Sequence, residues 1–193
     1  MDVPKVAGDE KIVYSGRIFE ILKQPMKIGA KVVDFEIVRR SPGVRLLVVR
    51  DGNILLVKEF RAEHEGFDYR LPGGKVFDSL KDYKKTLDGG KDILKYAVEA
   101  ARKECLEETG ISVKMIEHVH TARCGASVSW DMYYFLVDDF DEKEDGQNLE
   151  DGEVIYPEWK TFDEAKQLCL KGDVKEDRTV GVLLRFLLGW RKD

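Results

Sequence analysis

The chain has few cysteines and no long apolar run, and both absences narrow its class. Only Cys105, Cys124 and Cys169 occur among 193 residues, and no two of them form a Cys-x-x-Cys pair. Three widely spaced thiols do not build a disulfide framework, so a reducing cytoplasm is the simplest expectation. The most apolar segment, 180–188, is too short for a membrane span and contains Arg185, so it predicts a core helix. The first residues show no apolar run of the signal-peptide type.

Histidine is scarce, and an excess of basic residues is lacking. His64, His118 and His120 form no cluster with a cysteine, so a zinc site is not expected. The formal net charge is -5, whereas proteins that bind nucleic acids need basic stripes to displace counterions. A small diphosphate does not need such a stripe, because a bound metal and a few local cations can neutralise it.

Segment 93–111 has the periodicity of a helix that ends at Gly110. The residues at helical spacing that predict its buried face are Leu94, Val98, Ala101 and Cys105. Glu104, Glu107 and Glu108 stand at i, i+3 and i+4, so they emerge as neighbours beside this face. Like charges at this spacing repel one another unless a cation binds, and Mg²⁺ or Mn²⁺ prefers such oxygen ligands. The alternative is a solvated glutamate-rich surface, but a position at the edge of the core favours a metal site.

Upstream of this helix stands Arg70-Leu71-Pro72-Gly73-Gly74-Lys75, and together the two segments resemble the Nudix hydrolases. The second half of that family's signature is met by residues 103–111, with lysine in place of arginine and cysteine in place of an aliphatic residue. The resemblance implies an α/β fold, an α/β/α sandwich with a curved mixed sheet. It also implies that the Gly74 carbonyl joins Glu104, Glu107 and Glu108 around Mg²⁺ or Mn²⁺.

The chain departs from the signature in two places. Between Gly74 and Lys103 lie 28 residues where the family pattern has 13, so about 77–90 is an insertion, either a short helix near the site or a disordered excursion. The positions of the family's loop-fixing salt bridge hold Lys95 and Lys103, which cannot pair. The remaining expectation for Lys103 is an ion pair with one of three nearby acids: Glu99, Asp88 or Asp92.

The rest of the chain, from about residue 12 to about residue 188, is similar to the ADP-ribose pyrophosphatase branch. Val13–Ile21 and Val32–Arg40 predict two strands of a small N-terminal antiparallel sheet. In that branch the sheet packs against a second subunit, so residues 1–42 are expected to form a dimerisation element of a homodimer. Residues 43–193 then form the hydrolase domain, which is expected to contain a strand at 158–160 and a capped helix from Thr161.

The same resemblance suggests which side chains meet the substrate. Arg61 ends a predicted strand that begins at Ile54, and it is either a substrate contact or a strand-end salt bridge. The other candidate substrate-binding cations are Arg70, Lys75 and Arg123. Segment 122–131 corresponds to a loop that closes over the substrate, and Asp131 stands roughly where the branch has its acid. Asp131 is therefore the expected general base, together with catalytic Glu104, Glu107 and Glu108; the alternatives are a solvated acidic loop or Glu150, Asp151 and Glu153.

The expected reaction is metal-dependent hydrolysis of the diphosphate of a small nucleoside diphosphate substrate. ADP-ribose, which would yield AMP and ribose 5-phosphate, is the first expectation. A nucleotide sugar is the alternative, since Arg70 replaces a glutamate common in the family. A non-catalytic module that binds a nucleotide is a third possibility, against which the complete glutamate set argues. Neither nucleic acid nor a membrane is an expected partner.

Overall fold

A computed structural model describes residues 3–144 and 146–189, so the outermost residues of both expected domains lie outside the described part. Its centre is a six-stranded mixed sheet in which β5 and β11 run parallel and the other pairs run antiparallel. The order is β13-β6-β5-β11-β9, with β7 paired to β6. The strands are β5 (Gly43–Arg50), β6 (Asn53–Arg61), β7 (Gly66–Arg70), β9 (Glu117–Ala122), β11 (Met132–Val137) and β13 (Ile155–Thr161).

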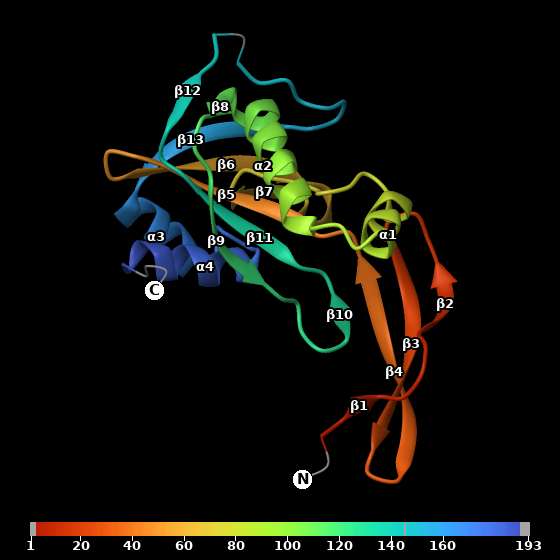
Figure 1. The fold of residues 1–193 in the computed structure, drawn as a ribbon. Helices are drawn as coiled ribbons and strands as arrows, with labels where there is room; N and C mark the ends of the chain where they lie inside the picture. Colours follow the sequence, from red (N-terminus) through yellow and green to blue (C-terminus); the bar gives the residue numbers. More distant parts are fainter. Residues whose placement is uncertain (1–2, 145, 190–193) are drawn as a thin grey trace.

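Helices cover both faces of this sheet (Figure 1). Helix α2 (Ile93–Thr109) lies on one face, and α3 (Phe162–Lys171) and α4 (Asp177–Leu187) lie on the other. The two faces follow from the alternation of side chains along a strand. In β5, Leu46 packs in the α2 cluster, whereas its neighbour Leu47 packs in the cluster of α3 and α4. The predicted α/β/α sandwich with a mixed sheet is therefore confirmed.

The helix ends agree with the sequence signals. Gly110 ends α2 with φ 72°, a left-handed conformation that glycine adopts without steric cost. Thr161 and Glu164 form the expected capping box at the start of α3. The predicted core helix near the C-terminus is α4. Within the described residues, no helix is long and apolar enough to cross a membrane.

The N-terminal segment forms a separate sheet whose long hairpin projects away from the sandwich (Figure 1). Its strands are β1 (Lys5–Val6), β2 (Lys11–Ser15), β3 (Phe19–Ile28) and β4 (Lys31–Arg40), and β10 (Val128–Ser129) pairs parallel to β4. The prediction of a single strand over Val13–Ile21 was wrong. The chain turns at Gly16, whose amide donates to the Phe19 carbonyl, so β2 and β3 pair with each other instead.

Segment 77–90, the predicted insertion, contains a folded helix, α1 (Leu80–Asp88), rather than a disordered excursion. Ser79 caps its first turn by accepting a hydrogen bond from the Asp82 amide. The ring of Phe77 packs between Tyr83 of α1 and Tyr96 of α2, with centroids 5.6 and 5.2 Å away. The ring of Phe77 therefore joins α1 to α2 of the sandwich. The remaining elements are a 3-10 helix (Ala62–His64) and the paired strands β8 (Ile111–Val113) and β12 (Phe140–Glu142).

Candidate active site

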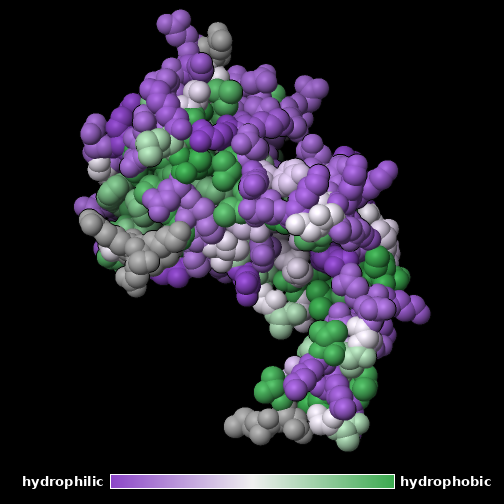
Figure 2. All heavy atoms as spheres, in the orientation of Figure 1, coloured by the Kyte–Doolittle hydropathy of each residue, from purple (hydrophilic) through white to green (hydrophobic). Residues whose placement is uncertain are grey.

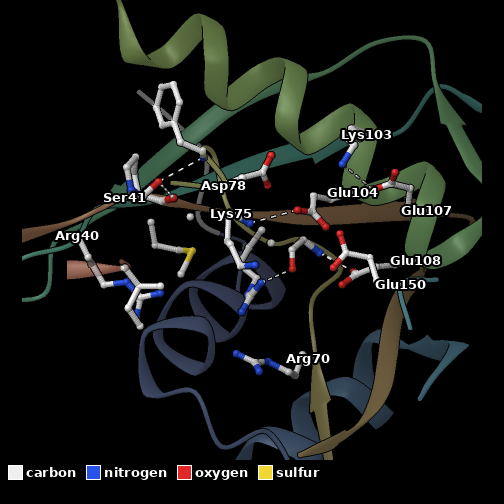
Figure 3. Close-up of a pocket in the computed structure, with 18 of the residues that line it drawn as sticks. Arg40, Ser41, Arg70, Lys75, Asp78, Lys103, Glu104, Glu107, Glu108 and Glu150 are labelled. Carbon is white, nitrogen blue, oxygen red and sulfur yellow. Dashed lines mark hydrogen bonds and ion pairs between the residues drawn. The ribbon is translucent and has the colours of Figure 1, made fainter. Parts of the chain in front are cut away.

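A pocket opens where the two sheets, the start of α1 and the C-terminal half of α2 meet. The glycine pair 73–74 and segment 148–153 complete its lining. Figure 3 shows the carboxylates of Glu104 and Glu108 on one side of this pocket and the guanidinium groups of Arg40 and Arg70 elsewhere around it. Acidic and basic side chains therefore line the same pocket.

The 73–74 pair leaves no room for a side chain, and at Gly73 the backbone itself requires glycine. Gly73 has φ +138°, and a Cβ there would overlap the Val44 carbonyl across the loop. A Cβ on Gly74 would overlap the Glu104 carboxylate. The backbone can therefore approach α2 closely, and the Gly73 amide donates to Glu108 Oε2 at 2.8 Å while the Lys75 amide donates to Glu104 Oε1 at 3.2 Å. The loop and the glutamates form one hydrogen-bonded unit.

The three glutamates have different surroundings. Glu108 is only 8% exposed, and its burial raises its pKa to about 8. Burial also raises the pKa of Glu104, and the Glu107 and Glu153 charges add to this effect. Glu107 is half-buried and pairs with Lys103, its Oε2 lying 3.2 Å from Nζ. The expected partners of Lys103, namely Glu99, Asp88 and Asp92, were therefore wrong: of its two neighbours four residues away on α2, Lys103 pairs with Glu107 rather than with Glu99.

The chemistry of this set fits a divalent cation. Carboxylates that are buried beside one another and lack a full cationic partner are destabilised in their charged form, which a hard cation would reverse. Over residues 3–144 and 146–189, however, no three acidic, histidine or cysteine side chains converge on one point as they stand. Glu107 is turned towards Lys103, with its Oε2 atom 3.2 Å from Nζ.

Three of the four candidate cations line the pocket. Arg61 Nη1 lies 2.7 Å from Glu59 Oε1, and its Nη2 lies 2.5 Å from Glu63 Oε1, so its strand-end salt bridges are present. Arg70 Nη1 lies 3.4 Å from Glu59, while the Arg70 Nε atom is buried without a hydrogen-bond partner. Burial and the nearby Arg45 charge lower the pKa of Arg70, so an added anion would be favourable there. Lys75 is exposed at the rim.

Asp131 and Arg123 do not belong to the pocket lining, whereas Glu150 and Glu153 do. The Asp131 carbonyl accepts from the Gly43 amide at 3.0 Å, and burial together with the Asp131 charge raises the pKa of Tyr83, which places this carboxylate towards α1. Asp151 of the acidic loop is exposed and outside the lining.

The acidic loop is fastened to the end of α2. The Asn148 amide donates to the Glu107 carbonyl at 2.8 Å, and Gln147 Nε2 donates to the Glu108 carbonyl at 2.6 Å. These bonds satisfy carbonyls that a helix end leaves without partners. They also bring Glu150 and Glu153 beside the glutamates of α2, although more than 40 positions separate either of them from Glu108.

Several pocket residues were missed by sequence reasoning. Trp130 lies between two arginines, with the guanidinium carbons of Arg40 and Arg178 4.0 and 4.1 Å from its ring centroid. Arg40 and Trp130 line the pocket, and Arg40 Nε is buried without a hydrogen-bond partner. Arg45 also lines it and is 7% exposed. A signal for Arg45 existed in the sequence, because a charged residue interrupts the apolar run 44–49 of a buried strand.

Comparison with known proteins agrees with this geometry. The family model described as "NUDIX domain" matches residues 39–180, well over half of the chain. A protein named ADP-ribose pyrophosphatase from Bacillus subtilis (strain 168) is 23% identical over 170 residues, covering 86% of this chain and 84% of its own. A crystal structure of an ADP compounds hydrolase superposes with a TM-score of 0.66 at 18% identity, covering 96% of this chain and 91% of its own. The chain therefore belongs to the NUDIX domain family and is a Nudix hydrolase.

Proposed function

We propose that this protein hydrolyses the diphosphate bond of a nucleoside diphosphate linked to a second group, with ADP-ribose as the preferred substrate. The observation that carries the proposal is the unit in which the 73–74 loop donates to Glu104 and Glu108 inside a pocket that also holds arginines. The similarity to an ADP-ribose pyrophosphatase supports ADP-ribose. AMP and ribose 5-phosphate would be the products.

Glu104, Glu107, Glu108 and the Gly74 carbonyl are the proposed ligands of Mg²⁺ or Mn²⁺. When bound, the metal supplies charge that polarises the phosphoryl oxygens and lowers the pKa of an attacking water. The Gly74 carbonyl already accepts from the Val44 amide at 3.0 Å, and a carbonyl oxygen has a second lone pair to offer. The chain itself binds the diphosphate through Arg61, Arg70 and Lys75.

The general base is proposed to come from the acidic loop, as Glu150 or Glu153. Both carboxylates line the pocket and neither needs a change of fold to reach a substrate there. Asp131, the first expectation, lies outside the lining, so a role as base would require the 122–131 segment to move. Arg123 would likewise contact a substrate only after such a movement.

The reaction is tested by incubating the purified protein with Mg²⁺ and a panel of ADP-ribose, nucleotide sugars and nucleoside triphosphates. The measurement is phosphomonoester release with and without EDTA. AMP formed from ADP-ribose only in the presence of metal is the expected result. Cleavage restricted to a nucleotide sugar would keep the reaction class and replace the substrate, and no release from any compound would contradict the proposal.

We also propose that the protein is a homodimer formed through residues 1–42. Large apolar side chains are exposed on one face of the projecting sheet, among them Val33 and Phe35, each of which is 40% exposed. Figure 2 shows hydrophobic residues gathered along this arm. An apolar face of this kind is typical of a surface that pairs with another protein, and a second copy is the partner proposed here.

A reducing compartment such as the cytoplasm is the proposed location. Cys105 is a free thiol in the α2 cluster, and Cys169 is a free thiol in the cluster on the other face of the sheet. Burial raises the pKa of the Cys105 thiol to about 12 and that of Cys169 to about 11. Both thiols therefore act as small apolar side chains of the core.

A further inference from the structure

Arg45 is a buried cation directly beneath the loop of the glycine pair. It follows Val44 in β5 and therefore points to the opposite face of the sheet, towards α4. Its Nη1 donates to the Gly73 carbonyl at 2.5 Å, and its Nε donates to Glu176 Oε2 at 3.0 Å. One planar guanidinium thus joins the loop backbone to the first residue before α4.

Glu176 is held in place independently of the loop. Its Oε2 accepts from Thr179 Oγ1 at 2.8 Å, and Thr179 in turn contacts the hydroxyl of the buried Tyr134. Although burial alone would raise the pKa of Glu176, the charges of Arg45 and Arg70 hold it at about 2. Glu176 is therefore an anion in a fixed position at the start of α4. Its ion pair with Arg45 orients the guanidinium group.

The same anion begins a row of alternating charges that ends at the rim of the pocket. Arg70 Nη2 lies 3.6 Å from Glu176, Arg70 Nη1 lies 3.4 Å from Glu59, and Glu59 pairs with Arg61. Each charge in this row faces one of opposite sign, so the row is a network rather than an isolated pair. The loop is thereby connected through Arg45 to the cations that would meet the substrate.

Among the described residues, no other cationic side chain connects the 73–74 loop to the start of α4. Lys103 is engaged with Glu107, and Lys95 is exposed on α2. The other tethers of the loop are three backbone bonds, from Val44 to Gly74, from Leu46 to Pro72 and from Val76 to Pro42, and the two bonds to Glu104 and Glu108. The bonds to Glu104 and Glu108 involve the same carboxylates that the loop is expected to orient. They therefore cannot fix the position of the loop independently of these carboxylates.

We propose that Arg45, fixed by Glu176, is the positioning residue of the 73–74 loop. It holds the Gly73 carbonyl so that the Gly73 amide faces Glu108 and the Lys75 amide faces Glu104. Where it concerns catalysis, this inference rests on the proposed function. A buried ion pair with a purely stabilising role is often replaceable by apolar residues without loss, so the contact to a loop carbonyl is what distinguishes Arg45.

The test uses Arg45→Lys, since lysine keeps the charge near Glu176 but cannot reach Glu176 and the Gly73 carbonyl with two separate nitrogens. Val182→Ala in α4 is the control, because it removes volume from the core cluster of α3 and α4, of which neither Gly73 nor Gly74 is a member. Hydrogen exchange is measured for the amides of residues 73–76. Arg45→Lys is expected to accelerate it about tenfold relative to the rest of the sheet, the effect of one lost hydrogen bond to a charged group. Val182→Ala should affect its own helix only.

A second readout is Mn²⁺ binding by electron paramagnetic resonance, which needs no substrate. Arg45→Lys is expected to raise the half-saturating Mn²⁺ concentration about tenfold, the range found when partners of metal ligands are removed. In turnover assays it should lower kcat while KM stays near the wild-type value. Because exchange and Mn²⁺ binding do not depend on the substrate, they remain informative if the panel shows that ADP-ribose is not cleaved.

Wild-type exchange and Mn²⁺ binding in Arg45→Lys would overturn the proposal, and so would equal changes in Val182→Ala. If Arg45→Lys does not fold, Glu176→Gln is the second variant, since it keeps Arg45 and an acceptor for Thr179 but weakens the anchor. It should change both readouts in the same direction, and unchanged readouts in it would again contradict the role of Arg45.

Discussion

At the scale of single residues, burial distinguishes three glutamates that the sequence presents as equals. Glu108 is enclosed and bonded to the Gly73 amide, Glu104 is half-buried against Gly74, and Glu107 is turned to Lys103. A metal ion would compensate most strongly for the buried charge of Glu108. Glu108 is therefore the residue whose loss should affect catalysis most.

Glu108→Gln should keep the fold and abolish turnover. The amide oxygen of glutamine can still accept from Gly73, but the anionic ligand is lost. The expected fall in kcat exceeds about 100-fold, because even residues that only support metal ligands commonly cost 10–100-fold. Steady-state kinetics with circular dichroism checks this, and Glu99→Gln on the exposed side of α2 is the control. Near-normal turnover in Glu108→Gln would exclude it as a ligand.

Glu176 makes stability depend on acidic pH. Its pKa lies at about 2 in the folded protein, below the ordinary 4.5. A lowered carboxyl pKa stabilises the fold above the unfolded pKa, and this contribution is lost as pH falls from about 4.5 through about 2. Urea unfolding across this range should show the loss, of a few kcal/mol at most. The Glu176→Gln variant should have a lower free energy of unfolding near neutrality, and this free energy should change less with pH between about 4.5 and 2. If the variant loses stability as steeply as the wild type in this range, the loss comes from other carboxylates.

At the scale of elements, the insertion helix α1 is joined to the N-terminal sheet by a buried carboxylate. Glu20 is fully buried and accepts from Arg39 Nε at 2.7 Å and from Lys84 Nζ at 2.9 Å. Although burial alone would raise it, these two cations lower the pKa of Glu20. The start of α1 lines the pocket. The contact between Glu20 and Lys84 therefore helps to position this side of the pocket.

Lys84→Met should loosen α1 without unfolding the sandwich. Glu20 keeps Arg39, so the loss is about 1–2 kcal/mol of local stability, discounted because Lys84 is partly exposed. Hydrogen exchange over residues 77–90 should accelerate, whereas Lys81→Met, on an exposed position of the same helix, should leave it unchanged. Equal exchange in both variants would show that the aromatic packing of Phe77 alone holds the helix.

At the scale of the whole molecule, the projecting sheet explains why a dimer is expected. Phe35 pairs with Gln24 across the hairpin, and Val33 pairs with Met26, so these side chains share one face. Near Glu20 this face is covered by α1, and farther along the hairpin it carries Val33, Phe35 and Met26. A stable interface between proteins buries about 1,200–2,000 Å² in total, which a long two-stranded arm can supply.

Phe35→Lys should convert the dimer into monomers. A lysine on this face would have to be buried without a partner in the interface, which is strongly unfavourable. Sedimentation velocity at several concentrations measures the change, and Leu170→Lys on α3 is the control because Leu170 is equally apolar and 62% exposed. A wild-type protein that sediments as a monomer at all concentrations would contradict the proposed dimer.

The sequence by itself determined the elements whose signals are local. The periodicity of 93–109, its terminal Gly110, the glycine pair 73–74 and the capping box at Thr161 all act within a few residues, and the structure contains each of them. The three glutamates on one helical turn follow from the same short-range geometry. The acidic turn of α2 could therefore be predicted from local patterns, whereas the fold was predicted from the resemblance of that turn and the glycine pair to the Nudix signature.

Only the tertiary structure decided which distant side chains meet in the pocket. Arg45 and Glu176 are 131 positions apart, and Glu150 reaches the site because its loop caps the end of α2. Asp131 stands outside the lining because its segment pairs with β4 and β5. Such contacts depend on how sheets and helices pack, and no periodicity along the chain specifies them.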